Sequence, residues 1–486
     1  MEQTNKAVQL LLALTPLVVL IILLGLNLDI EFDNDAFSVN QVILLFSALI
    51  AALLGLANGA KARSILDKVV LNIKDTKKAI FILLLIGALT GTWFLGGIVP
   101  AMVYYGLDFI NIDFFLPTAV IISALVSLST GSSWTTTATV GAALMILGNT
   151  LEFSAPMTAG AVISGAYFGD KLSPLSDTTN LAPAMSGTDL YTHIRYMLYT
   201  TIPSLLITLV LFTILGWNTT TNTMDAGTIE SVQSALQEYF VITPWLFIVP
   251  IIVITLIAFK IDALMAIAVG IIGGLIMALL FQFELMETVG NGSFPVFEAA
   301  SRSIYGTMNV PIPNVAITEI SNIELAELLG TSGMKGMLGT ILLILSAMTF
   351  GGAMEAAGFL TIITKAIVSL ARGTASLITS TLVACGVLNV TASDQYLAIV
   401  VPGRMFKDVY RERGLAPENL SRTLEDGGTV TSVLVPWNTC GVYQSETLNV
   451  ATGEYFMYAF FNLISPLMTL VYAWFGIRIK RLNAKN

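Results

Sequence analysis

Four short polar clusters interrupt the apolar stretches of this 486-residue chain. In the first half, Thr130-Gly131-Ser132-Ser133 lies about 44 residues before Pro174-Leu175-Ser176-Asp177. In the second half, Thr391-Ala392-Ser393-Asp394 lies about 45 residues before Pro436-Trp437-Asn438-Thr439. Hydroxyl, amide and carboxylate oxygens suit hard cations such as Na⁺, and paired breaks in the two halves of a membrane chain are typical of a transport site. We therefore expect these clusters to bind a small cation.

The first cluster lies between two apolar arms, one from Leu116 to Leu128 and one that ends at Leu147. Neither arm comfortably spans ~30 Å of hydrocarbon, so we predict a re-entrant hairpin near 115–149 with a polar tip. The alternative is one continuous span whose hydroxyls bond back to their own helix. A matching tip at Asn389–Asp394, in a second hairpin near 375–404, favours the hairpin. The two tips supply the candidate ion-site residues Thr130, Ser132, Ser133, Ser393 and Asp394.

The segment 165–180 holds the densest group of candidate ligands. Pro174 removes a helical N–H and clashes with the preceding turn, so we expect a broken span near 155–186. Asp170 and Asp177 are seven residues apart, which would place them on one face of a helix. A carboxylate within a bilayer is costly and is by default a functional candidate; the alternative for Asp170 is local pairing with Lys171. The candidates in this segment are Asp170, Ser176, Asp177, Thr178 and Asn180.

The second half contains a corresponding broken span near 427–448. Asn438 and Thr439 occupy the positions of Ser176 and Asp177, Asp394 occupies that of Ser133, and Glu446 lies further along the span. A partly desolvated carboxyl group can exchange protons near neutral pH. A cation that binds the same carboxylate would displace the proton, which couples H⁺ and Na⁺ in opposite directions. The Na⁺ ligands that we predict are Ser132, Ser133, Ser176, Asp177 and Asn438.

Three other polar residues give weaker evidence of a functional role. Glu425 and Asp426 stand at the expected cytoplasmic start of a span, so we interpret them as a solvated helix cap or as charges at the mouth of the pathway. His193, the only histidine, falls in an expected cytoplasmic link and is interpreted as having no special role.

Composition indicates an all-α polytopic membrane protein. The chain is 55% hydrophobic and only 11% charged, and its mean hydropathy is +0.81; soluble domains carry about twice this charge. Two cysteines give neither a disulfide framework nor a zinc pattern. The sequence has no phosphate-binding or dinucleotide-binding motif, so we expect a transporter without cofactors, not an enzyme, and no nucleic-acid partner. No cleavable signal peptide is expected, because the first apolar stretch reads as a span.

We predict ten spans, near residues 8–27, 41–57, 79–105, 155–186, 199–217, 243–259, 262–281, 336–360, 427–448 and 455–476.

The charge distribution predicts the topology of these spans. With both termini in the cytoplasm, the cytoplasmic segments hold 20 of the 23 Lys and Arg residues, including an amphipathic connector at 57–78 and a basic tail at 477–486. The expected location is the inner, cytoplasmic membrane. The outer loops are acidic, as in Asp29, Glu31, Asp33 and Asp35.

In this topology the two hairpins open from opposite sides of the membrane, so the fold predicted is an inverted-topology repeat of two five-span halves. The halves are 1–217 and 243–476, joined by an outer loop at 218–242, and the second half carries an outer insertion at 282–335 around Pro311, Pro313 and Asn314.

The sequence of 165–180 resembles the signature of the NhaC family of Na⁺/H⁺ antiporters, and Thr130–Thr136 and Val435–Gly441 also fit that family. The resemblance implies a homodimer with scaffold and transport parts, facing hairpin tips and an elevator-like movement. It carries Asp170, Ser176, Asp177, Thr178 and Asn180 over as ion-site residues. The family also includes members similar to malate/lactate antiporters.

These residues are compatible with two transport functions. The first is Na⁺/H⁺ antiport by alternating access; the second is organic-acid antiport coupled to the same ions. A carboxylate substrate usually recruits Arg, Lys or helix N-termini, and we expect no Arg in either core, with only Lys171 near. That pattern favours a bare cation. Closed hairpins and inverted repeats argue against a channel, and the absence of a nucleophile–base set argues against a membrane-embedded enzyme.

Overall fold

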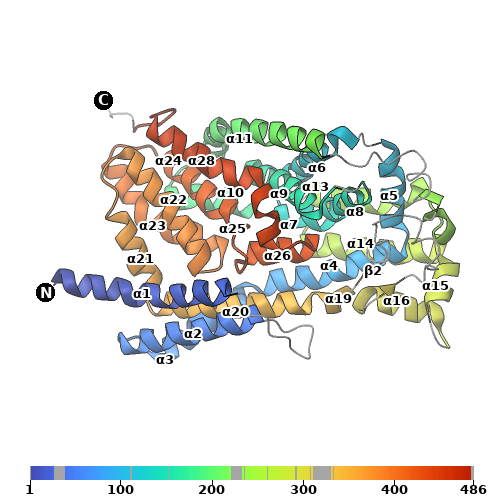
Figure 1. Cartoon of the computed structure of the whole chain (residues 1–486), viewed down its shortest axis with the longest axis horizontal. Coiled ribbons are helices and arrows are strands. Elements are labelled where there is room, and N and C mark those ends of the chain that lie inside the picture. Colours follow the sequence, from blue (N-terminus) through green and yellow to red (C-terminus); the bar gives the residue numbers. More distant parts are fainter. Residues whose placement is uncertain are drawn as a thin grey trace. The chain divides into compact units, whose positions relative to one another are not determined.

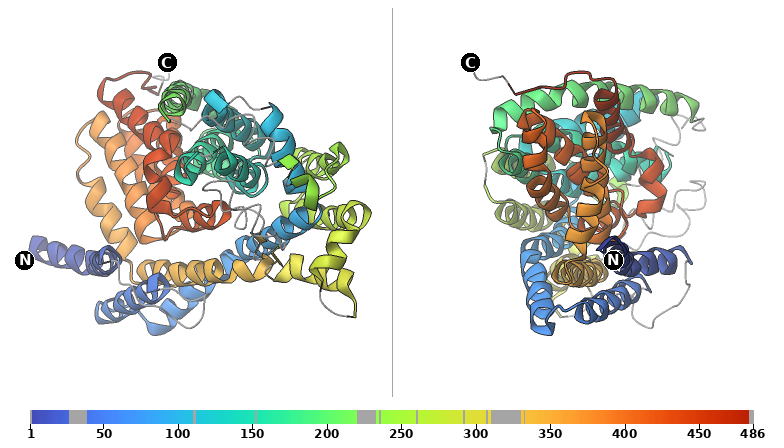
Figure 2. Two further views of the ribbon diagram at one scale, coloured as in Figure 1. Left: turned by 45° about the vertical axis from the view of Figure 1, so that its right-hand side comes forward. Right: turned by 90° about the vertical axis from the view of Figure 1, so that its left-hand side faces the viewer.

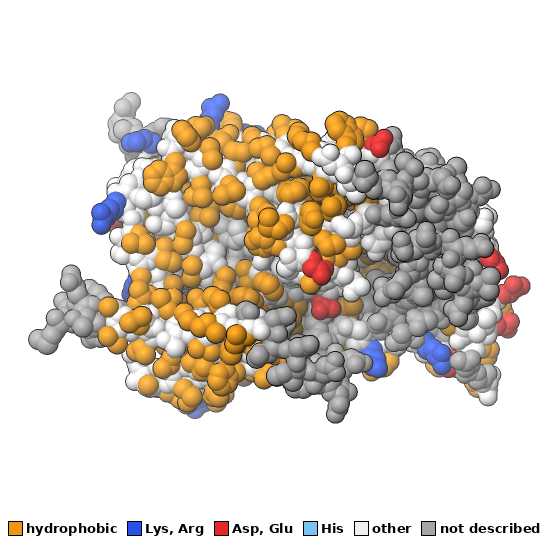
Figure 3. Space-filling view, viewed as in Figure 1, with side chains coloured by type: hydrophobic (Ala, Val, Ile, Leu, Met, Phe, Trp, Pro, Cys, Tyr) orange, Lys and Arg blue, Asp and Glu red, His pale blue; other side chains and the backbone are white. Residues whose placement is uncertain are grey.

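The computed structural model describes residues 2–26, 39–109, 112–151, 153–219, 233–234, 236–259, 261–290, 293–306, 308–309, 330–331 and 333–482. These residues are almost wholly helical (Figure 1), and the strands β1 (Met308–Asn309) and β2 (Gly330–Thr331) form one antiparallel ribbon. In the part of the chain that the structure describes, six helices are long and apolar enough to cross a membrane, or up to seven if one bent pair is a single span. Hydrophobic side chains cover much of the surface seen in Figure 3. The chain is therefore a multi-pass membrane protein, and the count of ten spans stays a prediction.

The chain divides into two compact units. Unit 1 comprises Met1–Lys77, Tyr167–Thr208 and Gly339–Asn486, and unit 2 comprises Lys78–Ala166 and Leu209–Leu338. Each unit thus draws on both halves of the sequence. The boundaries of the compact units therefore differ from those of the two predicted halves. The inverted repeat itself stays a prediction.

Unit 1 contains most of the polar breaks. Its C-terminal helices, orange to red in Figure 2, form one bundle. Helices α9 and α11 are shared with unit 2 at the unit boundary. The elements of unit 1 are α1 (Glu2–Gly25), α2 (Val39–Ala57), α3 (Ala62–Asp75), α9 (Ala155–Leu172), α10 (Asp177–Ser186), α11 (Leu190–Asn218), α20 (Leu338–Ala356), α21 (Phe359–Val368), α22 (Thr374–Thr391), α23 (Gln395–Glu412), α24 (Pro417–Leu424), the π-helical turn η4 (Glu425–Thr429), α25 (Val430–Ser432), α26 (Thr439–Leu448), α27 (Thr452–Tyr455), η5 (Phe456–Tyr458) and α28 (Phe460–Trp474).

Unit 2 contains the first hairpin and the outer insertion. Its elements, besides the first part of α9 and the last part of α11, are α4 (Lys77–Leu95), α5 (Ile98–Phe109), η1 (Ile112–Phe114), α6 (Phe115–Thr130), α7 (Ser133–Thr136), the π-helical turn η2 (Thr137–Gly141), α8 (Ala142–Thr150), η3 (Pro244–Phe247), α13 (Ile248–Ala258), α14 (Ala263–Phe281), α15 (Phe283–Val289), α16 (Pro295–Tyr305), β1, β2 and α19 (Gly333–Gly336).

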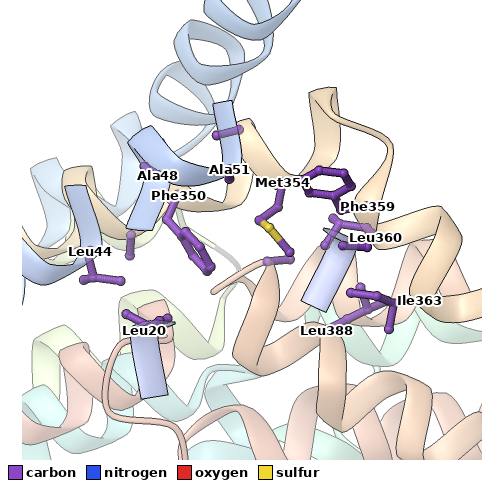
Figure 4. Close-up of a cluster of buried hydrophobic side chains, with 14 of the residues drawn as sticks. Leu20, Leu44, Ala48, Ala51, Phe350, Met354, Phe359, Leu360, Ile363 and Leu388 are labelled. Atoms are coloured by element: carbon purple, nitrogen blue, oxygen red, sulfur yellow. The ribbon is translucent and has the colours of Figure 1, made fainter. Parts of the chain in front are cut away.

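An apolar core in unit 1 supports the second hairpin. Leu20, Leu44 and Phe350 are fully buried there together with Met354, as Figure 4 shows. A Cβ atom on Gly351 of α20 would lie 2.3 Å from the carbonyl oxygen of Ala392, directly after α22. Glycine at this position therefore lets α20 pack closely against the hairpin tip.

The four predicted breaks are all present. Helices α6 and α7 separate after Thr130, α9 and α10 separate between Leu172 and Asp177, α22 and α23 separate after Thr391, and α25 and α26 separate between Ser432 and Thr439. The connector at 57–78 contains the predicted helix, α3.

Several predicted boundaries differ from the structure. The second hairpin extends to Glu412, the last broken span begins at Pro417 rather than 427, and the predicted span at 79–105 divides at Gly97, whose φ is +74°. The short helix α21 was not predicted. The acidic loop 29–35 and the insertion residues Pro311, Pro313 and Asn314 lie outside the described residues.

Candidate functional site

The first break is built around Ser176. This residue is the N-cap of α10, and its side chain accepts a hydrogen bond from the Thr179 N–H at 3.4 Å. The Thr179 hydroxyl reaches back to the carbonyl oxygens of Asp170 (3.0 Å) and Lys171 (3.1 Å) at the end of α9. The Asn180 amide donates to Pro174 O at 2.9 Å and to Ser176 O at 2.7 Å. Side chains thus satisfy the carbonyl groups that the missing helical turn leaves free.

The second hairpin tip and the second break lie in contact. Ser393 has a φ of +59°, a left-handed conformation that is uncommon outside glycine. Asp394 then caps α23 by accepting from Leu397 N at 2.9 Å. Asn438 caps α26 by accepting from Cys440 N at 3.0 Å. The Thr439 N–H donates to Ser393 O at 3.0 Å, which joins the break to the tip.

Asn389 connects this tip to the helix that leads to the second break. Its amide donates to Gly427 O (3.2 Å), Gly428 O (2.8 Å) and Thr431 Oγ1 (3.0 Å), and its two oxygens accept from Asn438 Nδ2. The residue is fully buried. Its side chain therefore supplies donors to a stretch of backbone that the π-helical turn η4 leaves irregular.

We expect Asn389→Ala to lower the free energy of unfolding by about 2 kcal/mol, because it leaves buried carbonyl and amide groups unpaired. Thermal unfolding of the purified protein in detergent measures this loss. Asn58→Ala, at an exposed position before α3, is the matched control and should unfold like the wild type. Equal stability of the two variants would show that the Asn389 contacts contribute little.

The first hairpin tip in unit 2 has the same local construction. Gly131 has a φ of +69°, and Ser132 caps α7 by accepting from Thr135 N at 3.1 Å. Three pairs of residues in the breaks thus correspond at a spacing of about 262 residues, namely the left-handed Gly131 and Ser393, the caps Ser132 and Asp394, and the caps Ser176 and Asn438. The cap positions pair Asp394 with Ser132 rather than with Ser133, one residue from the predicted register. That Thr130, Ser132 and Ser133 ligate an ion stays a prediction.

Three carboxyl groups of unit 1 lie in the neighbourhood of one tyrosine. The charges of Asp177, Asp394 and Asp170 all act on the hydroxyl of Tyr396, which stands two residues after the tip. Helix α10, which begins at Asp177, packs against α23. Tyr396 is 42% exposed, Asp177 is exposed and Asp170 is 8% exposed. The first break and the second tip therefore lie close to one another, and we call Asp177, Asp394 and Asp170 the acidic cluster, of which Asp177 is exposed.

This acidic cluster could hold a cation only with additional ligands. Among the described residues, no three Asp, Glu, His or Cys side chains converge closely enough to hold a metal ion. A bound Na⁺ would take its other ligands from hydroxyls, carbonyl oxygens or water, which hard cations accept. Ser176 and Thr178, whose hydroxyls lie 3.2 Å apart, stand on either side of Asp177 in the sequence. Glu446, by contrast, is exposed on α26, and no interaction joins it to this cluster in the described part of the chain.

A buried ion pair lies behind the first break. Lys171 Nζ is 2.5 Å from Asp426 Oδ1, and both side chains are 0% exposed. Ser465 Oγ donates to Asp426 Oδ1 at 2.5 Å and accepts from Lys171 at 2.9 Å, and Thr469 Oγ1 donates to Asp426 Oδ2 at 2.6 Å. The prediction of a solvated Asp426 is wrong, because its helix begins at Pro417 and Asp426 lies more than two turns inside it. Lys171 likewise pairs across the fold, with Asp426 of η4.

Glu425, His193 and Arg422 are also buried, contrary to the sequence interpretation. Glu425 accepts a hydrogen bond from Thr178 Oγ1 at 3.1 Å. His193 lies within α11 rather than in a link, and its Nδ1 is 2.8 Å from Ser421 Oγ. The Arg422 guanidinium stacks 4.7 Å from the Tyr196 ring. The expectation that no arginine enters the core is therefore wrong. Sequence reasoning missed Arg422 and Glu425 because α24 and the start of η4 form a short polar stretch that was assigned to the cytoplasmic side. It missed His193 because α11 begins at Leu190 and not near residue 199.

Two charged groups outside the predicted spans have shifted pKa values. An ion pair with Glu418, 2.5 Å long, raises the pKa of Lys480. Hydrogen bonds from the side chain and backbone of Thr192 lower the pKa of Asp189, which precedes α11. The Lys480 backbone also donates to and accepts from the Asn419 side chain. The C-terminal segment thus fixes the start of α24, the helix that leads to Glu425 and Asp426.

Comparison with known proteins matches the chain to antiporters. The model of the Na⁺/H⁺ antiporter family matches residues 165–477, from the start of the first signature to just beyond α28. An uncharacterized Na⁺/H⁺ antiporter of Haemophilus influenzae is 35% identical over 97% of each chain. A malate-2H⁺/Na⁺-lactate antiporter of Bacillus subtilis is 34% identical over 94% of each chain.

The Na⁺/H⁺ antiporter NhaC of Alkalihalophilus pseudofirmus is 35% identical over 83% of each chain. The resemblance to NhaC proteins that the segment 165–180 predicts is therefore confirmed. These matches span both halves of the sequence and all the breaks of unit 1. The chain belongs to the Na⁺/H⁺ antiporter family.

Proposed function

We propose that this protein exchanges Na⁺ for H⁺ across a membrane and that the acidic cluster of Asp177, Asp394 and Asp170 binds the cation. The observation that carries this proposal is the meeting of the first break and the second hairpin tip around Tyr396. Two interrupted helices place carboxylates and free backbone groups together there, which is how transporters of this kind build cation sites. The family and the NhaC relatives support the same exchange.

The chemistry of the exchange follows from competition for one carboxylate. When Asp177 is ionised, Na⁺ finds a negative oxygen near the Ser176 and Thr178 hydroxyls, in a site that solvent reaches. When a proton occupies the carboxyl group, that oxygen loses its charge and its attraction for Na⁺. Binding of one ion therefore releases the other, and the two ions move in opposite directions.

Alternating access completes the proposal. The paired left-handed residues and helix caps support an inverted-topology repeat, in which one half closes as the other opens. We place the chain in the inner membrane with both termini in the cytoplasm, because the basic residues concentrate on that side. We also propose a homodimer, as the family resemblance implies.

Purified protein in liposomes with a trapped pH-sensitive dye tests the function. External Na⁺ should make the interior more alkaline, because inward Na⁺ movement drives H⁺ out. The same addition to protein-free liposomes gives the background, and an equal concentration of choline gives the osmotic control. No dye response to Na⁺ above the background would reject simple Na⁺/H⁺ exchange.

A second candidate function is Na⁺/H⁺ exchange coupled to organic acids. Arg422 favours it, because its guanidinium is 0% exposed and none of its three nitrogens has a hydrogen-bond partner among the described residues. A buried cation of this kind suits a carboxylate, and one relative is a malate-2H⁺/Na⁺-lactate antiporter. In the same liposomes, a dye response that requires malate on one side and lactate on the other would select this function. A full response to Na⁺ alone would select the first.

A further inference from the structure

Three hydrogen bonds join the second hairpin tip of unit 1 to the second break. Carbonyl oxygens at the end of α22 and in the tip accept all three of them. The pairs are Trp437 Nε1 to Val390 O (2.8 Å), Asn438 Nδ2 to Asn389 O (3.0 Å) and Thr439 N to Ser393 O (3.0 Å). We call these three hydrogen bonds the tip–break contact. Its last acceptor, Ser393, directly precedes Asp394 of the acidic cluster.

Asn389 lies at the centre of the tip–break contact. Its side-chain Oδ1 accepts a second hydrogen bond from Asn438 Nδ2, at 3.2 Å. Its Nδ2 donates to Gly427 O and Gly428 O of η4 and to Thr431 Oγ1 of α25. The side chain is fully buried, so it makes these hydrogen bonds with protein groups and not with bulk water. One amide therefore joins the end of α22, the π-helical turn and the second break.

The tip–break contact holds a backbone conformation that is unfavourable by itself. Ser393 has a φ of +59°, whereas the corresponding residue of the first half is Gly131, for which a positive φ costs little. A residue other than glycine keeps a left-handed conformation only where its surroundings hold it there. The hydrogen bond from Thr439 N to Ser393 O supplies such a restraint, and Asp394 follows as the first cap of α23. The position of Asp394 therefore depends on the tip–break contact.

We propose that Asn389 is a positioning residue for cation binding, which keeps the second tip in the conformation that places Asp394 in the acidic cluster. This inference rests on the proposed Na⁺/H⁺ exchange. Asn389 acts through Asn438 and the tip–break contact, and we assign it no contact with the ion itself. Without its amide, the tip adopts this conformation for only a fraction of the time, and Na⁺ binds tightly only to that fraction.

A positioning role changes the apparent Na⁺ affinity and not the maximal rate. If the tip is correctly formed in about one-tenth of the molecules, the Na⁺ concentration that gives the half-maximal rate rises about tenfold. Saturating Na⁺ selects the correctly formed tip and restores the rate. A purely structural role gives the opposite pattern. The maximal rate then falls because fewer molecules are folded, and the half-saturating Na⁺ concentration of the remaining molecules is unchanged.

Asn389→Ala in the dye-loaded liposomes tests the proposal, with the initial rate of the dye response measured over a series of Na⁺ concentrations. The half-saturating Na⁺ concentration should rise about tenfold, and the maximal rate per folded protein should stay within about twofold of the wild type. Asn462→Ala is the matched control. Asn462 is also a fully buried amide of unit 1, but it donates to Val430 O, at 2.9 Å, and takes no part in the tip–break contact. This control should keep the wild-type half-saturating Na⁺ concentration.

A second variant keeps the test decisive if Asn389→Ala does not fold. Trp437→Phe removes the donor to Val390 O but keeps an aromatic ring, so it weakens the same contact and should also raise the half-saturating Na⁺ concentration, by a smaller factor. An unchanged half-saturating concentration in the folded variant would overturn the assignment of Asn389. An equal rise in Asn462→Ala would overturn it as well, because any lost buried amide would then have the same effect. Failure of the wild type to move protons with Na⁺ is a different result and rejects the proposed function.

Discussion

Replacement of Asp177 by Asn is expected to abolish Na⁺-driven proton movement while leaving the fold intact. Asp177 is exposed in the acidic cluster and stands at the first position of α10. The amide removes the negative charge that attracts Na⁺ but keeps nearly the same volume. The charge also interacts favourably with the N-terminus of α10, so we expect a stability loss of no more than about 1 kcal/mol. The liposome dye assay measures the activity, and thermal unfolding in detergent measures the fold.

Asp408→Asn is the matched control for this change. Asp408 is an exposed aspartate of the same unit, on α23, at a distance of fourteen residues in the sequence from the Asp394 tip. Its loss of charge should leave the exchange at the wild-type rate. A fully active Asp177→Asn protein would remove Asp177 from the mechanism, and equal impairment of both variants would point to a general effect of charge on the protein.

The polar breaks could be predicted from the sequence because their causes are local. Pro174 cannot continue a helix, Gly131 adopts a left-handed conformation, and Ser176 and Asn438 have side chains suited to helix caps. Each of these properties belongs to a residue and its immediate neighbours. The contact between tip and break in the second half, from Thr439 N to Ser393 O, could be seen only in the structure.

The buried charges could not be predicted, because their burial depends on partners far away in the sequence. Aspartate is common at the start of a helix, which is how Asp426 was interpreted. Its burial is compensated by the ammonium of Lys171 and by the hydroxyls of Ser465 and Thr469. The three partners come from two other helices, α9 and α28. Arg422 lies in a run of charged and polar residues that reads as a cytoplasmic loop, and its stacking on Tyr196 depends on the packing of α11. The sequence did contain one indication of such a pair, because charged residues within membrane spans usually pair with one another and Lys171 and Asp426 both lie in or next to predicted spans.

The buried pair of Lys171 and Asp426 should show the largest effect on stability of any single contact in unit 1. Lys171→Met leaves an unpaired carboxylate at a site that is 0% exposed, and Asp426→Asn leaves an unpaired ammonium there. Breaking a buried ion pair from one side costs about 3–5 kcal/mol. We expect each single variant to lose that much in SDS-induced unfolding of the purified protein.

The double variant Lys171→Met/Asp426→Asn allows the free energy of the ion pair itself to be separated from the contributions of the neighbouring groups. It removes both charges, and the Asn side-chain oxygen can still accept from Ser465 or Thr469, so the double variant should be more stable than either single variant. The coupling free energy, which is the difference between the double loss and the sum of the single losses, should reach about 2–3 kcal/mol. Additive losses would instead mean that each charge is stabilised independently by hydroxyls and water. A large coupling together with retained Na⁺/H⁺ exchange in the double variant would show that the pair holds α9 against η4 and α28 and that the transported proton is carried by another group.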